Sequence, residues 1–215
     1  LHELVIGQIY ALYPDAIIEK KSEDYTRGLE INDETFLVSE LKNKRSNLYP
    51  WKRYDEFEGD SLAGLFSILS KTNEGEQLWV QIVISPRADN YLFNVNRTAQ
   101  YMFNSFCRIF RWRDRLKSKA QKNFVEQEKT AISTKAEEQQ YKINLRVAVK
   151  AQTKKTAEHQ LIALENAFTA FNSIDFNGFT PGRHIHGNKA LNLWEKRCLK
   201  ETMLMGINEL AGMYY

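Results

Sequence analysis

A chain of 215 residues with 43% hydrophobic and 12% aromatic residues can bury a substantial core, and a charged fraction of 27% is typical of globular domains. The net charge of +3 excludes a globally basic protein. No apolar run approaches the roughly 18–20 residues of a membrane-spanning helix, and no signal peptide is expected. Cys107 and Cys198 lie far apart without metal-ligand spacing, so reduced thiols are expected rather than a disulfide.

The first part of the chain predicts two helices and three strands. Pro14 ends the first helix, and Pro86, which cannot donate to a strand ladder, ends the last strand. Trp79 and Val83 make both faces of that strand apolar, so it is expected in the centre of a sheet. The predicted elements are a helix over Leu1–Tyr13, strands at Ala16–Ile18 and Thr35–Val38, an irregular stretch over Asn43–Asp60, a helix from Asp60 or Ser61, and a strand over Leu78–Ile84.

The second part predicts a long helix followed by a strand–helix–strand unit. Tyr141–Val149 alternates apolar and polar residues, which is typical of a strand buried on one face. Thr153 can cap the helix that follows it. The remaining predicted elements are a helix, or two in tandem, over Ser105 to about Gln140, a strand over Ser173–Thr180, a loop over Pro181–Lys189, a short helix near Trp194, and a helix from Ile207.

These elements predict an α+β fold with a ferredoxin-like plait, a second βαβ unit and a long helical insertion. Helix, strand, strand, helix, strand is the order of the βαββαβ plait without its first strand. That strand either precedes Leu1, because the chain starts without Met inside a helical pattern, or comes from elsewhere in this chain. The expected divisions are a plait over 1–88, a linker and charged helical insertion over 89–140, a βαβ unit with a helical extension over 141–200, and the start of a connecting helix over 201–215.

No Walker A, GxGxxG, CxxC or GxSxG pattern occurs. The sequence therefore predicts no catalytic residue, no metal site and no cofactor, and a protein that is not an enzyme.

One segment is strongly basic. It holds seven basic residues against Asp114 alone, a net charge of +6, so the rest of the chain carries −3. Such residues neutralise phosphates, and Phe110 and Trp112 have rings that can stack on bases. The alternative is a solvated helix whose acidic second half balances its charge. The candidate contacts to nucleic acid or an anionic surface are Arg108, Arg111, Arg113, Arg115, Lys117, Lys119 and Lys122.

A second candidate is Arg183-His184-Ile185-His186-Gly187. The His-hydrophobic-His pattern resembles the metal-binding motif of HUH-type nicking endonucleases, in which a helical tyrosine attacks the phosphate, and Tyr214 or Tyr215 would take that role here. Because Pro181-Gly182 and Gly187-Asn188 flank the pair, it is expected in a loop rather than in a central strand. A loop pair facing solvent or a phosphate is the alternative.

Three stretches together resemble a known family. They are Gln8–Thr26, Gly59–Arg87 and Met205–Tyr215, with Asp60-Ser61-Leu62, Gly75-Glu76, Trp79-Val80-Gln81-Ile82 and Asn208-Glu209-Leu210-Ala211 in the matching places. They are similar to the cytoplasmic region that precedes the ATPase core in the coupling ATPases of conjugative type IV secretion systems.

The resemblance implies a non-catalytic region that assembles and couples substrate to a DNA-transfer motor. The implied partners are the ATPase motor domain and neighbouring subunits of a homo-oligomer, with DNA or an anionic membrane surface as possible contacts of the basic segment. The implied location is the cytoplasm at the inner face of the bacterial membrane. The alternatives are a stand-alone nucleic-acid-binding plait, although its strands lack an exposed aromatic pair for stacking bases, and the HUH-type nuclease.

Overall fold

The structure is a computed structural model that describes residues 2–26, 34–57, 59–87, 119–200 and 202–214. The chain divides into two compact units, Leu1–Glu30 and Ile31–Tyr215. The first unit contains α1 (His2–Leu12), which confirms the predicted helix before Pro14, and no residue of this helix is buried within the chain. The strand expected at Ala16–Ile18 is wrong, because these residues form neither a helix nor a strand.

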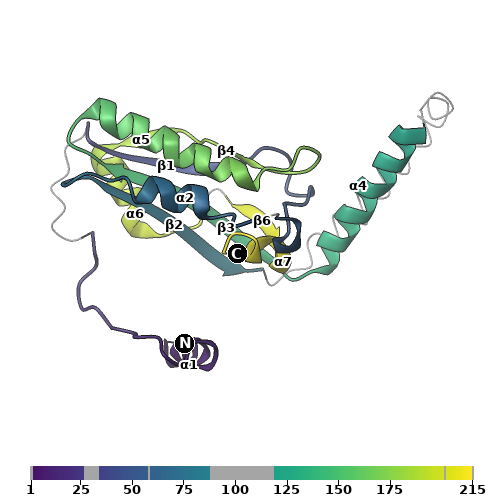
Figure 1. The fold of residues 1–215 in the computed structure, drawn as a ribbon, viewed down its shortest axis with the longest axis horizontal. Helices are drawn as coiled ribbons and strands as arrows, with labels where there is room; N and C mark the ends of the chain where they lie inside the picture. Colours follow the sequence, from purple (N-terminus) through teal and green to yellow (C-terminus); the bar gives the residue numbers. More distant parts are fainter. Residues whose placement is uncertain (1, 27–33, 58, 88–118, 201, 215) are drawn as a thin grey trace. The chain divides into compact units, whose positions relative to one another are not determined.

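The second unit is built on one sheet in which every strand pair is antiparallel. Its order is β2-β3-β1-β4, while β5 lies beside β1 and β6 beside β3 (Figure 1). The strands expected for the units 1–88 and 141–200 thus lie in the same sheet. The strands are β1 (Phe36–Asn43), β2 (Gln77–Pro86), β3 (Gln140–Lys150), β4 (Phe179–Thr180), β5 (His184–His186) and β6 (Met203–Gly206).

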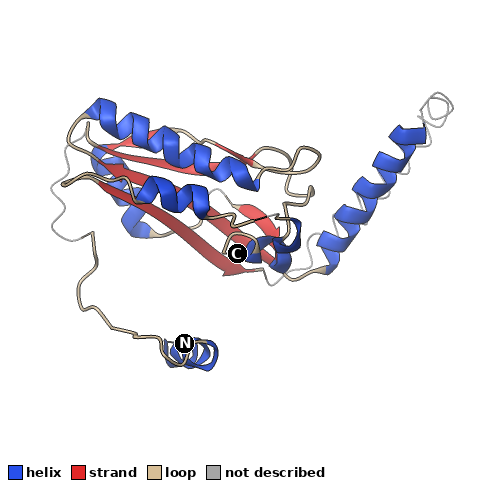
Figure 2. Cartoon of the chain, in the orientation of Figure 1, coloured by secondary structure: helices blue, strands red, loops and turns tan. Residues whose placement is uncertain are grey.

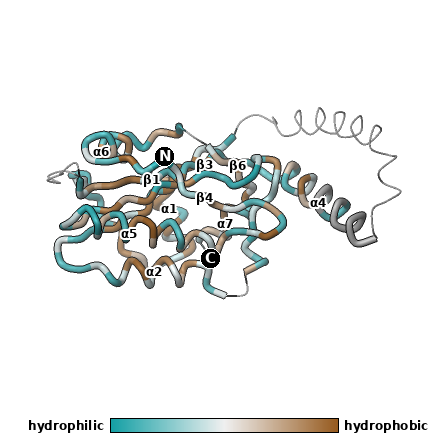
Figure 3. Tube along the Cα trace, turned by 90° about the horizontal axis from the view of Figure 1, so that it is seen from above, coloured by the Kyte–Doolittle hydropathy of each residue, from teal (hydrophilic) through white to brown (hydrophobic). Residues whose placement is uncertain are grey.

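Helices cover both faces of this sheet. Figure 3 shows the hydrophobic central strands between α6 on one side and α2 with α5 on the other. The helices, drawn in blue in Figure 2, are α2 (Ala63–Leu69), α4 (Lys119–Glu137), α5 (Lys154–Ala167), α6 (Gly187–Lys196) and α7 (Ile207–Ala211). No helix in the described ranges is long and apolar enough to cross a membrane.

The larger core lies between the sheet and α5. The Thr153 side chain accepts a hydrogen bond from the backbone N–H of Thr156, which confirms the predicted cap. Leu161 and Leu164 lie on the predicted buried face of α5 and pack with Leu37 of β1 and Val147 of β3. The apolar spacing of α5 therefore matches the apolar face of the strands that it covers.

The second core, between the sheet and α6, contradicts one prediction. The strand β3 was expected to be buried on one face, but Asn144, Arg146 and Ala148 on its other face are also fully buried. Trp194 of α6 packs on this face with Phe36 of β1. The polar alternation in β3 therefore marks a buried polar cluster and not a solvent-facing surface.

Three further expectations differ from the structure. The strand β2 lies at an edge of the sheet and pairs with β3, so it is not central. The strand expected over Ser173–Thr180 is reduced to the two residues of β4. The loop expected over Pro181–Lys189 contains β5 and the first turn of α6. The short strands β4 and β5 form by pairing with β1, and local sequence patterns do not show this pairing.

Candidate functional site at the root of an inserted helix

A long segment is inserted between two neighbouring strands of the sheet. Pro86 of β2 lies opposite Tyr141 of β3, and the Arg87 backbone N–H donates to the Gln140 carbonyl at 3.0 Å. Antiparallel neighbours need only a two-residue turn to join them. Residues 88–139 are therefore not required to close the β2–β3 hairpin.

The described end of this insertion is α4. Its sequence is rich in Lys, Glu, Gln and Ala and contains neither Pro nor Gly, a composition that favours a helix. Figure 1 shows α4 leading away from the layers of the sheet, with its C-terminal end at β3. We call residues 88–139 the arm. Its predicted helix is confirmed over Lys119–Glu137, and its earlier part lies outside the described residues.

The root of the arm is held by a buried lysine. Lys135 is 3% exposed, although lysine is almost never fully buried without a partner. Its ammonium lies 3.0 Å from a carboxylate oxygen of Glu209, near the start of α7. It also donates hydrogen bonds to the carbonyls of Leu204 at 2.9 Å and Tyr49 at 3.2 Å. One side chain thus joins the arm to β6, α7 and the stretch that follows β1.

Glu209 is the acceptor at the centre of this cluster. Besides Lys135, it accepts from the backbone N–H groups of Trp51 at 2.8 Å and Gly206 at 2.7 Å. Burial raises the pKa of the Glu209 carboxyl, and Lys135 and these N–H donors oppose that shift. Burial likewise lowers the pKa of Lys135, and Glu209 opposes it. Desolvation therefore disfavours the charged form of both residues, and the attraction between the two charges offsets part of that cost.

A second acidic residue strengthens the same junction. Glu138, directly after α4, lies 2.9 Å from the Arg53 guanidinium. Its carboxylate also accepts from the Asn208 side-chain amide at 2.8 Å. The root thus contains two carboxylates and two cations drawn from three separate parts of the chain. We call Arg53, Lys135, Glu138 and Glu209 the root cluster.

Another buried cation, Arg146 of β3, lies on the face of the sheet that α6 covers. It is fully buried, and its guanidinium lies 2.9 Å from Glu40 and 3.0 Å from the Gln81 side-chain oxygen. It also donates to the carbonyls of Leu193 and Cys198, in and just after α6. Arg146 therefore fixes the C-terminal end of α6 to the sheet, with four of its five N–H donors used in these contacts.

The two histidines lie in a strand, so their expected position in a loop is wrong. His184 and His186 belong to β5 and pair with Ser39 and Leu37 of β1. The His184 ring nitrogen Nε2 lies 3.0 Å from the buried Glu165 carboxylate. Across the described residues, no group of three or more His, Cys, Asp or Glu side chains is arranged to hold a metal ion.

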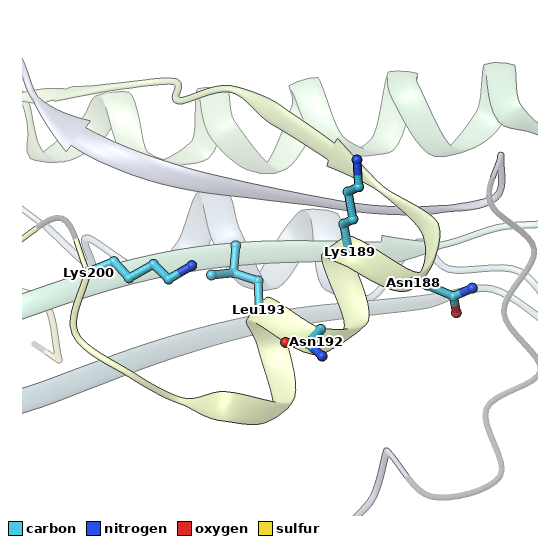
Figure 4. A pocket seen from close by; sticks show the side chains of 5 residues that line it. All are labelled: Asn188, Lys189, Asn192, Leu193 and Lys200. Atoms are coloured by element: carbon cyan, nitrogen blue, oxygen red, sulfur yellow. The ribbon is translucent and has the colours of Figure 1, made fainter.

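An open groove with a volume of about 360 Å³ runs along α6. Figure 4 shows the side chains of Asn188, Lys189, Asn192 and Lys200 around Leu193. The lining contains amide and ammonium donors and no carboxylate.

The basic segment itself falls largely outside the described residues. Lys119 and Lys122 lie in the first part of α4, where the backbone alone is described. The proposed contacts outside the described residues are Arg108, Arg111, Arg113, Arg115 and Lys117.

The sequence did not single out the root cluster or Arg146. Lys135 lies among other polar residues of α4, and its partners are 69 to 86 positions away. The one available signal was Glu209, which belongs to the tail stretch of the family resemblance. For Arg146 the signal was a charged residue between apolar neighbours in a strand. The same pattern is equally typical of a side chain that faces solvent.

The comparisons identify a domain family without a stated role. A family model described as "Domain of unknown function (DUF8128)" matches residues 3–214. Comparison with curated proteins and with solved structures found no match.

Proposed function

The chain belongs to the DUF8128 family, and we propose that it is a non-catalytic assembly and substrate-coupling region of a conjugative type IV secretion DNA-transfer ATPase. In this proposal the arm is the part that reaches a partner, and the sheet with its two helical layers is the body that holds it. The proposed location is the cytoplasmic side of the bacterial membrane, beside the motor domain and neighbouring subunits.

The observation that carries the proposal is the buried attachment of the arm. A segment that the hairpin does not need is nevertheless fixed by Lys135, at the cost of desolvating an ammonium and a carboxylate. A surface loop without a role gains nothing from such an attachment, because long insertions are tolerated thermodynamically without one. A fixed root instead gives α4 a defined direction where it leaves the sheet, which would favour a contact of the arm with DNA or with a neighbouring subunit.

The finer fold proposal is the ferredoxin-like plait. The elements β1, α2, β2, β3, α5 and β4 follow one another as βαββαβ, and their spatial order β2-β3-β1-β4 is compatible with the split βαβ arrangement. The first strand would then be β1, in the same chain, and not a strand before Leu1. The arm would be an insertion into the central hairpin of the plait.

The coverage of the sheet favours this proposal over a stand-alone RNA-recognition plait. Such modules stack bases on an open sheet face. Here Trp194 and Ala190 of α6 pack on one face, and α5 packs on the other. Nucleic acid would therefore have to bind to the arm or to the donors of the α6 groove rather than to the sheet.

The test is binding of fluorescent single- and double-stranded DNA, titrated with salt. For duplex DNA, the slope of log K against log salt should flatten by about 0.9 for each phosphate that the protein no longer neutralises. Changing Arg108, Arg111, Arg113 and Arg115 to Gln should therefore reduce the slope by up to about 3.6 and leave the fold intact. The matched control is Lys154→Gln with Lys155→Gln at the exposed start of α5.

Three outcomes distinguish the candidate functions. A reduced slope in the arm variant alone supports the proposal. Equal binding by the wild type and the arm variant would show that these arginines of the arm do not contact DNA. Nicking that requires Mn²⁺ and disappears in His184→Ala would replace the proposal with the HUH-type nuclease.

A further inference from the structure

The strand β2 presents a long edge to which another strand can be added. Within the described residues it pairs with β3 along ten positions, from Gln77 opposite Lys150 to Pro86 opposite Tyr141, and with no other strand. Figure 1 shows β2 at the margin of the sheet. The N–H and C=O groups on the outer side of such a strand are a template for pairing.

β2 itself lacks the sequence features that commonly protect an edge strand. Edge strands are commonly short, or carry lysine, proline or inward-pointing charges. β2 is ten residues long and carries no charged residue, and its proline is the last residue. The opposite margin of the sheet is different, because β4 and β5 have two and three residues and Pro181 lies between them. The β2 edge is therefore the margin that is suited to pairing.

We propose that β2 pairs with β2 of a second copy of this chain, which joins two sheets into one continuous antiparallel sheet. Two copies that pair in this way are related by a twofold axis perpendicular to the sheet. The axis keeps each face of the sheet on the same side in both copies. Opposite residues must therefore belong to the same face, and the axis passes through a residue position of β2.

The side chains select one register. With the axis at Gln81, Leu78 lies opposite Ile84, Val80 opposite Ile82, Trp79 opposite Val83, and Gln77 opposite Ser85. Each pair then joins apolar to apolar or polar to polar residues, which is the favourable pattern between strands. With the axis at Ile82, Trp79 would instead meet Ser85, and Leu78 would meet Pro86, which has no N–H for the ladder. In the first register Ile84, which is 40% exposed, lies opposite Leu78.

This inference goes beyond the proposed function and does not depend on it. The pairing uses the backbone of β2 and its side chains, and neither the arm nor the α6 groove takes part. Loss of DNA binding would leave the β2 pairing intact, and loss of the pairing would leave the DNA contacts of the arm untouched.

A cysteine pair tests the register directly in the full chain. In a background with Cys107→Ser and Cys198→Ser, Gln77→Cys and Ser85→Cys are combined in one chain. Within one copy these positions lie about 26 Å apart, because strands rise about 3.3 Å per residue. Mild oxidation should give a covalent dimer of the double variant and of an equimolar mixture of the two single variants. Neither single variant should be cross-linked by itself.

The results that overturn the inference are equally defined. No covalent dimer of the double variant, or equal cross-linking of the single variants, rejects this register. A wild type that stays monomeric by light scattering up to about 200 μM rejects the pairing itself, taking that as an order of magnitude for weak association. A larger assembly without the 77–85 cross-link would indicate head-to-tail contacts instead.

An edge variant provides an independent measurement. Val83→Lys places a charge on the outer strand, as natural edge strands do, and should convert dimer to monomer. The matched control is Ile174→Lys, at a position 95% exposed and away from β2, which should remain dimeric. Circular dichroism of both variants shows whether the fold is retained. A folded Val83→Lys variant that stays dimeric contradicts the proposal.

Discussion

The attachment of the arm can be tested by removing its buried cation. Lys135→Met keeps a flexible side chain of similar length, so most of the packing is retained. It removes the 3.0 Å contact with Glu209 and the donors to the carbonyls of Leu204 and Tyr49. Breaking one partner of a buried pair typically costs about 3–5 kcal/mol, because the other charge stays buried. We therefore expect the free energy of unfolding to fall by about 4 kcal/mol.

A double-mutant cycle separates the pair from its surroundings. Glu209→Gln keeps an amide oxygen for one of the two backbone donors and should cost about 2–3 kcal/mol. If the residues act as a unit, the double variant should cost about 4 kcal/mol, well below the sum of the single variants. Urea denaturation followed by fluorescence measures each value, and the exposed Lys154→Met is the control.

The cycle has a clear contrary result. Costs that add to within about 0.5 kcal/mol would mean that Lys135 and Glu209 do not stabilise the fold as a pair. Hydrogen exchange gives a second readout, because Lys135→Met should reduce protection at the C-terminal end of α4 while the amides of β3 stay protected. Equal loss of protection in both would indicate general destabilisation and not release of the arm.

Three further predictions concern the same clusters. Burial raises the folded-state pKa of Glu209 above its ordinary value of 4.5. The stability that Glu209 contributes therefore falls as the pH rises from 4.5 to the folded-state pKa. Removing Lys135 raises this pKa further, so the pH range over which stability is lost becomes wider. The stability difference between wild type and Lys135→Met should therefore grow from pH 4.5 to pH 7, and a constant difference in urea denaturation would contradict this sign. Arg146→Met leaves Glu40 without its cation and should cost about 3–5 kcal/mol, with a red-shifted tryptophan emission as α6 loosens; an unshifted spectrum in a folded variant would show that Arg146 does not hold α6. Gly182→Ala places a methyl group against the Glu40 backbone carbonyl and should cost about 3 kcal/mol in thermal unfolding, whereas Gly64→Ala, with open space around it, should have no cost.

Local patterns predicted the elements whose stability is decided locally. The spacing of apolar residues in α5, its Thr153 cap, and the position of the strand β3 all appear in the structure as predicted, although β3 is buried on both faces and not on one. The α+β class follows from these elements and is also correct. Each of these features depends on residues within about one or two turns or strand lengths of each other.

The features that sequence patterns missed depend on distant partners. β5 and β6 are three and four residues long and exist as strands because β1 and β3 supply their hydrogen bonds. Arg146 was assigned to a solvent-facing side because nothing local shows that α6 covers it. Lys135 has the sequence context of a surface lysine, and its burial is decided by Glu209, 74 positions later. The root cluster could therefore be found only once the strands were paired.

The attachment of the arm also determines how a mechanical load would enter the domain. The chain leaves the sheet at Arg87 and returns beside it at Gln140, so tension along the arm would pull on the adjacent ends of β2 and β3. Hydrogen bonds at the end of a hairpin would then break one after another, which resists force poorly. Because Lys135 ties the arm to β6 and α7 as well, the load is shared with parts of the fold that lie off the hairpin. A load carried by α4 would therefore reach the body of the domain through Lys135 as well as through the hairpin.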